Sequence, residues 1–191
     1  MWWAAIRSNL SRLLKFSGRE SKQSFWLYVS GVAIVVIGGG MLAFMPLMAE
    51  SMARMQEFAE ANPDKATIRS GPDHYSITVE GHHPELMPDT NLIFAWLVTF
   101  FGLAFILLAA AVARRLHDRG MRGFWGFLPV PFIIFSTVSM RQYFGSENND
   151  MTQFLAIFAS NFLYMLSLAV LCILLAGKGD PETNSFGDAP D

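Results

Sequence analysis

The chain has 191 residues, of which 52% are hydrophobic and 17 are phenylalanine, and this composition is too apolar for one or two soluble domains. Its formal net charge is −2, and we expect no nucleic-acid partner. The single cysteine, Cys172, excludes an intramolecular disulfide framework.

Residues 1–15 predict a helix that lies on the membrane surface, because apolar and polar residues separate onto two faces at helical spacing. The apolar face carries Trp2, Trp3, Ile6, Leu10, Leu13 and Leu14, and the polar face carries Arg7, Ser8, Ser11, Arg12 and Lys15. A flexible basic tail is the alternative. Together with the turn that follows, this helix makes residues 1–24 the predicted N-terminal segment.

Four long apolar segments predict membrane-spanning helices. A helix needs about 20 apolar residues to cross a hydrocarbon core of roughly 30 Å, so three of the segments are long enough and the third along the chain is short. They are residues 25–49, 91–113, 124–140 and 154–176. We therefore expect an all-α integral membrane protein in which residues 25–176 form a four-helix membrane domain. A cleaved signal peptide explains the first segment poorly, because the segment is about twice as long as the usual apolar region.

Small and polar residues within the spans carry further predictions. Gly31 and residues 38–40 permit a neighbouring helix to approach closely, with a hinge or unwound segment as the alternative. Pro129 and Pro131 predict a kink or break near the start of the third span. Asn161 and Tyr164, three residues apart, predict hydrogen bonds from the fourth span to another helix.

The connector at residues 50–90 is acidic and rich in turn residues, and it predicts a small extracytoplasmic loop region. Helical spacing continues past the first span as far as Phe58, and Asn62-Pro63-Asp64 ends it. A turn at residues 70–73 between alternating apolar residues then predicts a small β-hairpin.

Three histidines of this loop are the candidates for a metal site: His74, His82 and His83. They have no partner four residues away and no fixed frame of further ligands. We therefore expect a solvated loop, with no metal and no cofactor.

Charge is segregated along the chain, and this predicts the orientation in the membrane. Basic residues are in excess in residues 1–24 and 114–122, whereas residues 50–90 are acidic. Since Lys and Arg mark the cytoplasmic side, we expect both termini inside and residues 50–90 and 141–153 outside. The tail, residues 177–191, is then an irregular cytoplasmic segment.

The end of the second span concentrates polar residues. We expect its helix to end at Gly120, a residue suited to a left-handed cap. Arg114 and Arg115 then lie at the negative end of the helix dipole, which favours cations. His117 and Asp118 follow directly, so the group forms a compact polar cluster.

Three short motifs adjoin the spans on the basic side. They are Phe16-x-Gly18-Arg19 followed by Phe25-Trp26; Ala113-Arg114-Arg115-Leu116-His117-Asp118 followed by Gly120, Gly123 and Trp125; and Asn184-x-Phe186-Gly187 with Pro190. Together they resemble the bacterial inner-membrane family known as domain of unknown function 805. The departures from its usual residues are Lys22, Arg122, Phe124, Asp188 and Ala189. The resemblance implies a small multi-pass protein of the bacterial inner (plasma) membrane, and it implies no activity.

Six polar residues of these motifs form the candidate site: Arg19, Arg114, Arg115, His117, Asp118 and Asn184. Because arginine forks match phosphate oxygens, we hypothesise that the cations bind an anionic lipid headgroup or a partner, oriented by Asp118 and Asn184. In the alternative, the arginines only set the topology. We also expect Asp118 to pair with Arg19 or Arg114.

A binding or scaffolding module is thus the favoured function, with membrane lipid, a second copy or another membrane protein as partner. A small transporter or channel subunit is the second class, although the spans lack the ionisable residues that mark ion pathways. An enzyme is the third class. His117 and Asp118 resemble an acid–base pair, but adjacent helical residues point about 100° apart, and we expect no catalytic residue.

Overall fold

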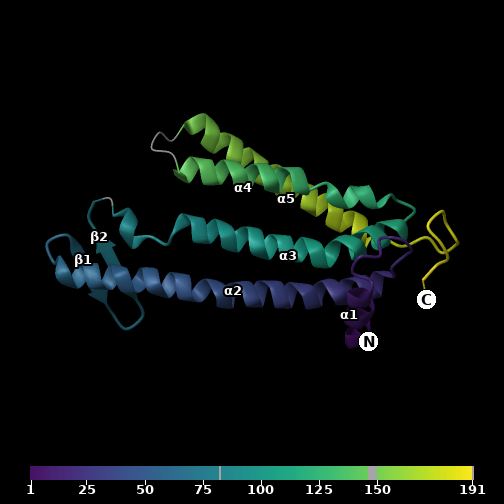
Figure 1. Ribbon diagram of the computed structural model, residues 1–191, viewed down its shortest axis with the longest axis horizontal. Helices are drawn as coiled ribbons and strands as arrows, with labels where there is room; N and C mark the ends of the chain where they lie inside the picture. Colours follow the sequence, from purple (N-terminus) through teal and green to yellow (C-terminus); the bar gives the residue numbers. More distant parts are fainter. Residues whose placement is uncertain (82, 146–149, 191) are drawn as a thin grey trace. The chain divides into compact units, whose positions relative to one another are not determined.

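The computed structural model describes residues 1–81, 83–145 and 150–190, which are mainly helical (Figure 1). They divide into two compact units. The first unit comprises Met1–Val36 with Val98–Asp191, and the second unit comprises Ile37–Leu97.

Within the described residues, four helical segments are long and apolar enough to cross a membrane. They are α2 (Lys22–Ala61), α3 (Thr90–His117), Gly123–Phe144 and α5 (Met151–Ala176). Each contains one of the predicted spans. This is the architecture of a multi-pass membrane protein.

The N-terminal helix forms as α1 (Trp2–Ser11), which is shorter than the predicted 15 residues. It lies against the start of α2, where Gly31 permits close approach, since a Cβ there would lie 2.9 Å from Ile6 Cδ1. Asn9 is buried, while the side chain of Trp3 is 75% exposed. The helix therefore turns one side toward the protein and presents Trp3 to its surroundings.

The backbone of the first two spans follows local sequence signals. α2 continues without a break through residues 38–40, so the alternative of an unwound segment there is wrong. α3 ends at His117, and Gly120 closes the turn with φ +67°. Glycine adopts this left-handed conformation without the steric penalty of a Cβ, so the predicted cap is confirmed.

The predicted break at the prolines separates a short 3₁₀ helix, η2 (Gly123–Phe127), from α4 (Val130–Gly145). Pro129 precedes α4 and Pro131 lies in its first turn. The first N–H groups of a helix have no intrahelical partner, so a proline in this turn loses no bond.

The hydrophobic core of the first unit lies among α2, α3 and α5. Its buried side chains are Phe25, Tyr28, Val32, Ala111, Leu116, Leu171 and Leu175. α4 packs against α5, and Asn161 Nδ2 of α5 donates to Ser136 Oγ of α4 at 2.6 Å. This hydrogen bond between spans confirms the prediction for Asn161. The same prediction for Tyr164 is wrong, because its hydroxyl forms no hydrogen bond with any described residue.

The second unit contains the predicted β-hairpin. α2 ends at Ala61, directly before the predicted stop. β1 (Ala66–Ser70) and β2 (Tyr75–Val79) pair antiparallel, with Ala66 opposite Val79. A 3₁₀ turn, η1 (Pro84–Leu86), follows, and its Leu86 carbonyl accepts a hydrogen bond from Ser51 Oγ of α2 at 2.6 Å.

Candidate functional site

Segments from four parts of the sequence meet at one end of the first unit: α1, the start of α2, the end of α3 and the tail after α5 (Figure 1). Their polar side chains form what we call the terminal cluster. It consists of Asn9, Arg19, Glu20, Arg114, Arg115 and Asp118, all of them buried, with relative exposures of 7% or less. Buried charges are costly unless they are paired and hydrogen-bonded, so the partners of these groups decide what the cluster can do.

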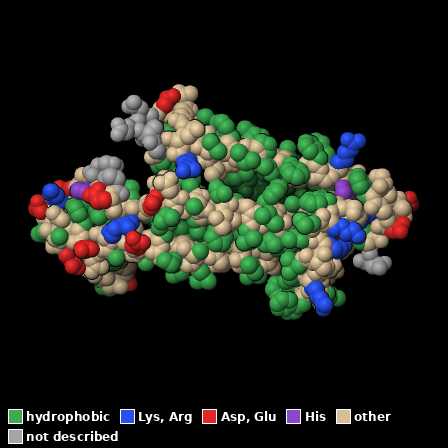
Figure 2. Space-filling view, viewed as in Figure 1, with side chains coloured by type: hydrophobic (Ala, Val, Ile, Leu, Met, Phe, Trp, Pro, Cys, Tyr) green, Lys and Arg blue, Asp and Glu red, His purple; other side chains and the backbone are tan. Residues whose placement is uncertain are grey.

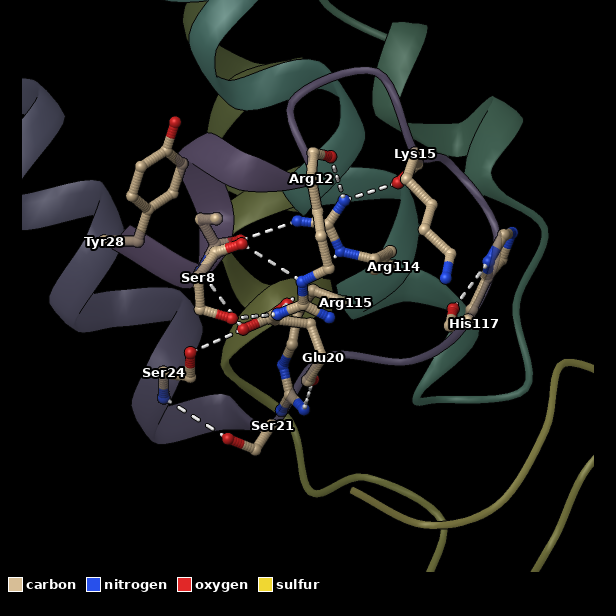
Figure 3. Close-up of polar contacts among 12 residues, drawn as sticks. Ser8, Arg12, Lys15, Glu20, Ser21, Ser24, Tyr28, Arg114, Arg115 and His117 are labelled. Atoms are coloured by element: carbon tan, nitrogen blue, oxygen red, sulfur yellow. Dashed lines mark hydrogen bonds and ion pairs between the residues drawn. The ribbon is translucent and has the colours of Figure 1, made fainter. Parts of the chain in front are cut away.

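Glu20 is the centre of one half of the cluster (Figure 3). Its Oε1 accepts hydrogen bonds from Asn9 Nδ2 at 3.2 Å and from Ser24 Oγ at 2.5 Å. Its Oε2 accepts from Arg12 Nη2 at 3.0 Å and from Arg114 Nε at 3.2 Å. Both carboxylate oxygens are therefore fully engaged inside the protein.

Glu20 was not among the candidate residues chosen from the sequence. A signal was nevertheless present, because Glu20 is the one acidic residue among the first 24 and directly follows the Gly18-Arg19 motif. A lone carboxylate among cations is a natural counter-ion for a buried arginine.

Arg114 also forms hydrogen bonds with the segment that follows α1 (Figure 3). Its Nη1 donates to the carbonyl oxygens of Arg12 at 3.0 Å and Lys15 at 2.5 Å, and its Nη2 donates to Asn9 Oδ1 at 2.6 Å. Together with the bond to Glu20, these contacts use most of the five donors of the guanidinium group. The end of α3 is thereby fixed to the N-terminal segment.

Asp118 is the centre of the other half. Its Oδ1 accepts from Arg19 Nε at 3.1 Å and Nη2 at 2.9 Å, while its Oδ2 accepts from Arg115 Nη1. The Arg19 and Asp118 side chains are only 1% and 4% exposed. The expected pairing of Asp118 with Arg19 is therefore present. The pairing with Arg114, named as the other option, is wrong because Arg114 is held by Glu20.

Arg115 of α3 and Arg119, which follows α3, cap the end of α5. Arg115 Nε donates to the Leu175 carbonyl at 3.0 Å and its Nη2 to the Gly177 carbonyl at 2.5 Å, while Arg119 Nη1 donates to the Leu174 carbonyl. The last carbonyls of a helix have no intrahelical partner and carry the negative end of its dipole. The guanidinium groups of Arg115 and Arg119 donate to these carbonyls and place positive charge at the negative end of the α5 dipole. The ends of α3 and α5 are therefore joined.

The tail docks on Arg19. The Nη1 of this guanidinium donates to the carbonyls of Glu182 at 2.7 Å and Gly187 at 3.2 Å, and its Nη2 donates to the Asp180 carbonyl at 2.5 Å. The described part of the tail was expected to be irregular. It contains no helix, and these bonds attach it to Arg19.

His117 and Asn184 form a second attachment of the tail. Asn184 Nδ2 donates to the His117 carbonyl at 3.0 Å, and the His117 ring stacks on Phe186 with ring centroids 4.0 Å apart. His117 Nδ1 lies 3.1 Å from the Gly18 carbonyl. The structure thus brings all six sequence-predicted residues together, and with them all three motifs.

Because the arginines of the terminal cluster are buried, other cations are the ones that a ligand can reach. Arg19, Arg114 and Arg115 were the residues expected to bind a headgroup, but their donors are directed at internal carboxylates, amides and carbonyls. At this end of the first unit, five other cations are exposed, and their side chains form no hydrogen bond or ion pair with any described residue. They are Arg7, Lys15, Lys22, Arg122 and Lys178, and we call them the basic rim. Figure 2 shows Lys and Arg side chains at this end of the first unit.

The outer-loop histidines were expected not to bind a metal, and this stays a prediction. In the part of the chain that the structure describes, no group of three His, Cys, Asp or Glu side chains is placed to hold an ion. His83 Nδ1 lies 2.8 Å from Glu85 Oε1. His82 lies outside the described residues.

The fold and the cluster together define a multi-pass α-helical membrane protein with helix ends joined by buried ion pairs. The family model described as "Protein of unknown function (DUF805)" matches residues 13–188. The chain belongs to this family, as its three motifs predicted. No curated protein and no solved structure matches the chain.

Proposed function

We propose that the protein is a scaffolding and binding module of the bacterial inner membrane, with both termini in the cytoplasm. Its rigid cytoplasmic end presents the basic rim to the anionic headgroups of the inner leaflet. The observation that carries this proposal is the division of the cations into two sets. The arginines of the terminal cluster are buried and internally bonded, whereas the cations of the basic rim are exposed and have no partner among the described residues.

The terminal cluster supplies the rigidity. Hydrogen bonds in a buried, fully satisfied network fix one arrangement of the groups that form it. Here the network ties α1, α3, α5 and the tail together through two carboxylates and three guanidinium groups. The excess of one cation adds to the positive field of the basic rim. The terminal cluster and the basic rim are therefore both attracted to the negatively charged cytoplasmic leaflet.

α1 supports the same orientation. Its Trp3 and Leu10 are exposed on a helix that carries the rim residue Arg7. Exposed tryptophan and leucine next to basic residues are typical of helices that lie in the headgroup region. α1 therefore serves as the edge of the scaffold that rests on the membrane.

A reporter that is active only outside the cytoplasm tests the topology. We expect it to work when inserted near Pro72, in the turn between β1 and β2, because the acidic 50–90 region lies outside. Fused after Asp191, which lies outside the described residues, it should be silent. Activity of the C-terminal fusion would overturn the cytoplasmic placement of the cluster.

A matched pair of charge variants tests headgroup binding. Arg7→Gln with Lys22→Gln removes two cations of the basic rim, and Lys65→Gln with Arg69→Gln removes two exposed cations of the second unit. Each cation near an anionic surface contributes about 1 kcal/mol, so the rim variant should bind short-chain phosphatidylglycerol roughly thirtyfold more weakly.

Native mass spectrometry during lipid titration measures this affinity, with phosphatidylcholine as the uncharged reference. The Lys65 and Arg69 variant should behave like the natural chain. Equal losses in the two variants would mean that the rim is not the headgroup-binding surface.

A further inference from the structure

The first unit contains an apolar cavity of about 300 Å³ between α3 and the α4–α5 pair. Its walls include Phe101 and Ala109 of α3, Gly126 of η2, Ile133 of α4, and Leu168 of α5. Figure 2 shows the hydrophobic surface hollowed between α3 and α4, so the cavity opens on the apolar surface of the spans. No described side chain fills it.

Water is a poor occupant of this cavity. A buried water needs two to four polar partners, and apolar cavities stay dry. The lining offers little besides the Trp26 indole N–H, the Tyr164 hydroxyl and the Cys172 thiol. Among the described residues, the Tyr164 hydroxyl forms no hydrogen bond. An apolar occupant therefore suits the site, and the surrounding bilayer supplies acyl chains at high concentration.

The length and position of the cavity match one leaflet. Along α3 its lining runs from Phe101 to Val112, and along α5 from Tyr164 to Leu175. Each is eleven steps of about 1.5 Å, or roughly 16 Å, which is about half of a 30 Å hydrocarbon core. α3 ends at His117 and α5 at Ala176, so the cavity reaches from the level of the terminal cluster to mid-membrane.

The volume also matches part of a single chain. A methylene group is about as large as a water molecule, whose share of the liquid is about 30 Å³, so the cavity holds about ten carbons. Part of one phospholipid chain fits this space, and a folded protein segment does not.

Two basic residues near the end of the cavity indicate that a lipid bound there has an anionic headgroup. Arg122 directly precedes Gly123, which lines the cavity, and Lys178 follows Leu175 by three residues. Both belong to the basic rim, and neither side chain has a partner among the described residues. A lipid whose chain lies in the cavity places its phosphate at this level.

We infer that the cavity holds one acyl chain of an anionic phospholipid of the leaflet at the terminal cluster, with Arg122 and Lys178 at its phosphate. The assignment of the headgroup rests on the proposed function, whereas the assignment of the chain rests on the cavity alone. The protein thereby carries a resident lipid between α3 and α5, helices whose ends Arg115 and Arg119 already join.

Native mass spectrometry of the full chain, purified in mild detergent and washed free of loose lipid, tests this inference. We expect one retained phosphatidylglycerol or another anionic phospholipid per chain. Ala109→Phe and Ala104→Phe place a ring in the cavity and should each lower its occupancy at least tenfold. The matched control is Ala169→Phe on α5, because Ala169 is exposed and does not line the cavity. It should retain the lipid.

Arg122→Gln with Lys178→Gln separates the two parts of the inference. This variant should keep one phospholipid but lose the preference for an anionic over a zwitterionic headgroup. Loss of that preference with the Arg7 and Lys22 variant unaffected would support the cavity lipid while overturning the wider basic rim. A natural chain that retains no phospholipid, or retains an uncharged isoprenoid or detergent only, would overturn the inference whatever the variants do. So would equal retention in all three Ala→Phe variants.

Discussion

Asp118→Asn should lower the free energy of unfolding by about 3 to 5 kcal/mol, the usual cost of removing one partner of a buried ion pair. Asp118 lies between Arg19 and Arg115, and all three side chains are at most 4% exposed. Asparagine keeps an acceptor of similar size but removes the charge and turns an amide donor toward the guanidinium groups. Two buried cations then lack their counter-ion. Unfolding in mild detergent by a denaturing surfactant measures the loss.

The control for this change is Asp64→Asn, which alters an exposed carboxylate of the second unit and should stay within about 0.5 kcal/mol of the natural chain. A double-mutant cycle with Arg19→Gln then measures the coupling between the two groups. Residues in one ion-pair network typically show interaction energies of about 0.5 to 3 kcal/mol. Additive effects of the two changes would contradict the coupling, and the motifs would then be neighbours without forming one energetic unit.

Glu20→Gln should have an effect of similar size, about 3 to 5 kcal/mol, because it leaves the buried guanidinium of Arg114 without its carboxylate. The second partner, Arg12, is 34% exposed and can turn to water, so the loss arises mainly at Arg114. The N-terminal segment should loosen first. Hydrogen exchange of residues 12–20 measures this local opening, and the unfolding free energy measures the total.

The matched control for Glu20 is Glu50→Gln. Glu50 is also paired with an arginine, Arg54, at 2.9 Å, but the two side chains are 67% and 37% exposed. Exposed pairs contribute about 0 to 1 kcal/mol, so the contrast between the two Glu→Gln changes isolates burial as the cause. Comparable small effects of both would show that Glu20 is well solvated in the membrane-embedded protein.

Local sequence patterns were sufficient to predict the helices, the hairpin and the turns of the fold. The apolar segments predicted the four spans, because length and hydropathy alone decide whether a helix can cross the hydrocarbon core. The turn at residues 70–73 predicted the hairpin, and Gly120 the left-handed cap. The prolines predicted the break before α4. Each signal acts within a few residues of the backbone that it shapes.

The membership of the candidate site was also largely predictable. Arg19, Arg114, Arg115, His117, Asp118 and Asn184 adjoin span ends, and short tethers keep them at one face, where the structure brings them together. Glu20 was missed because the excess of cations around it was interpreted only as a topology signal.

The sequence by itself thus determined the class of protein, the family, the spans and the group of polar residues at one end of them. Only the tertiary structure decided which cations are buried and which are free. Arg115 and Arg122 both belong to the basic stretch at residues 114–122, yet one caps a helix end 60 residues away and the other is exposed. The difference depends on where α5 ends beside α3 and on the direction of each side chain. Such contacts between distant segments follow from packing, and residue type and spacing do not encode them locally.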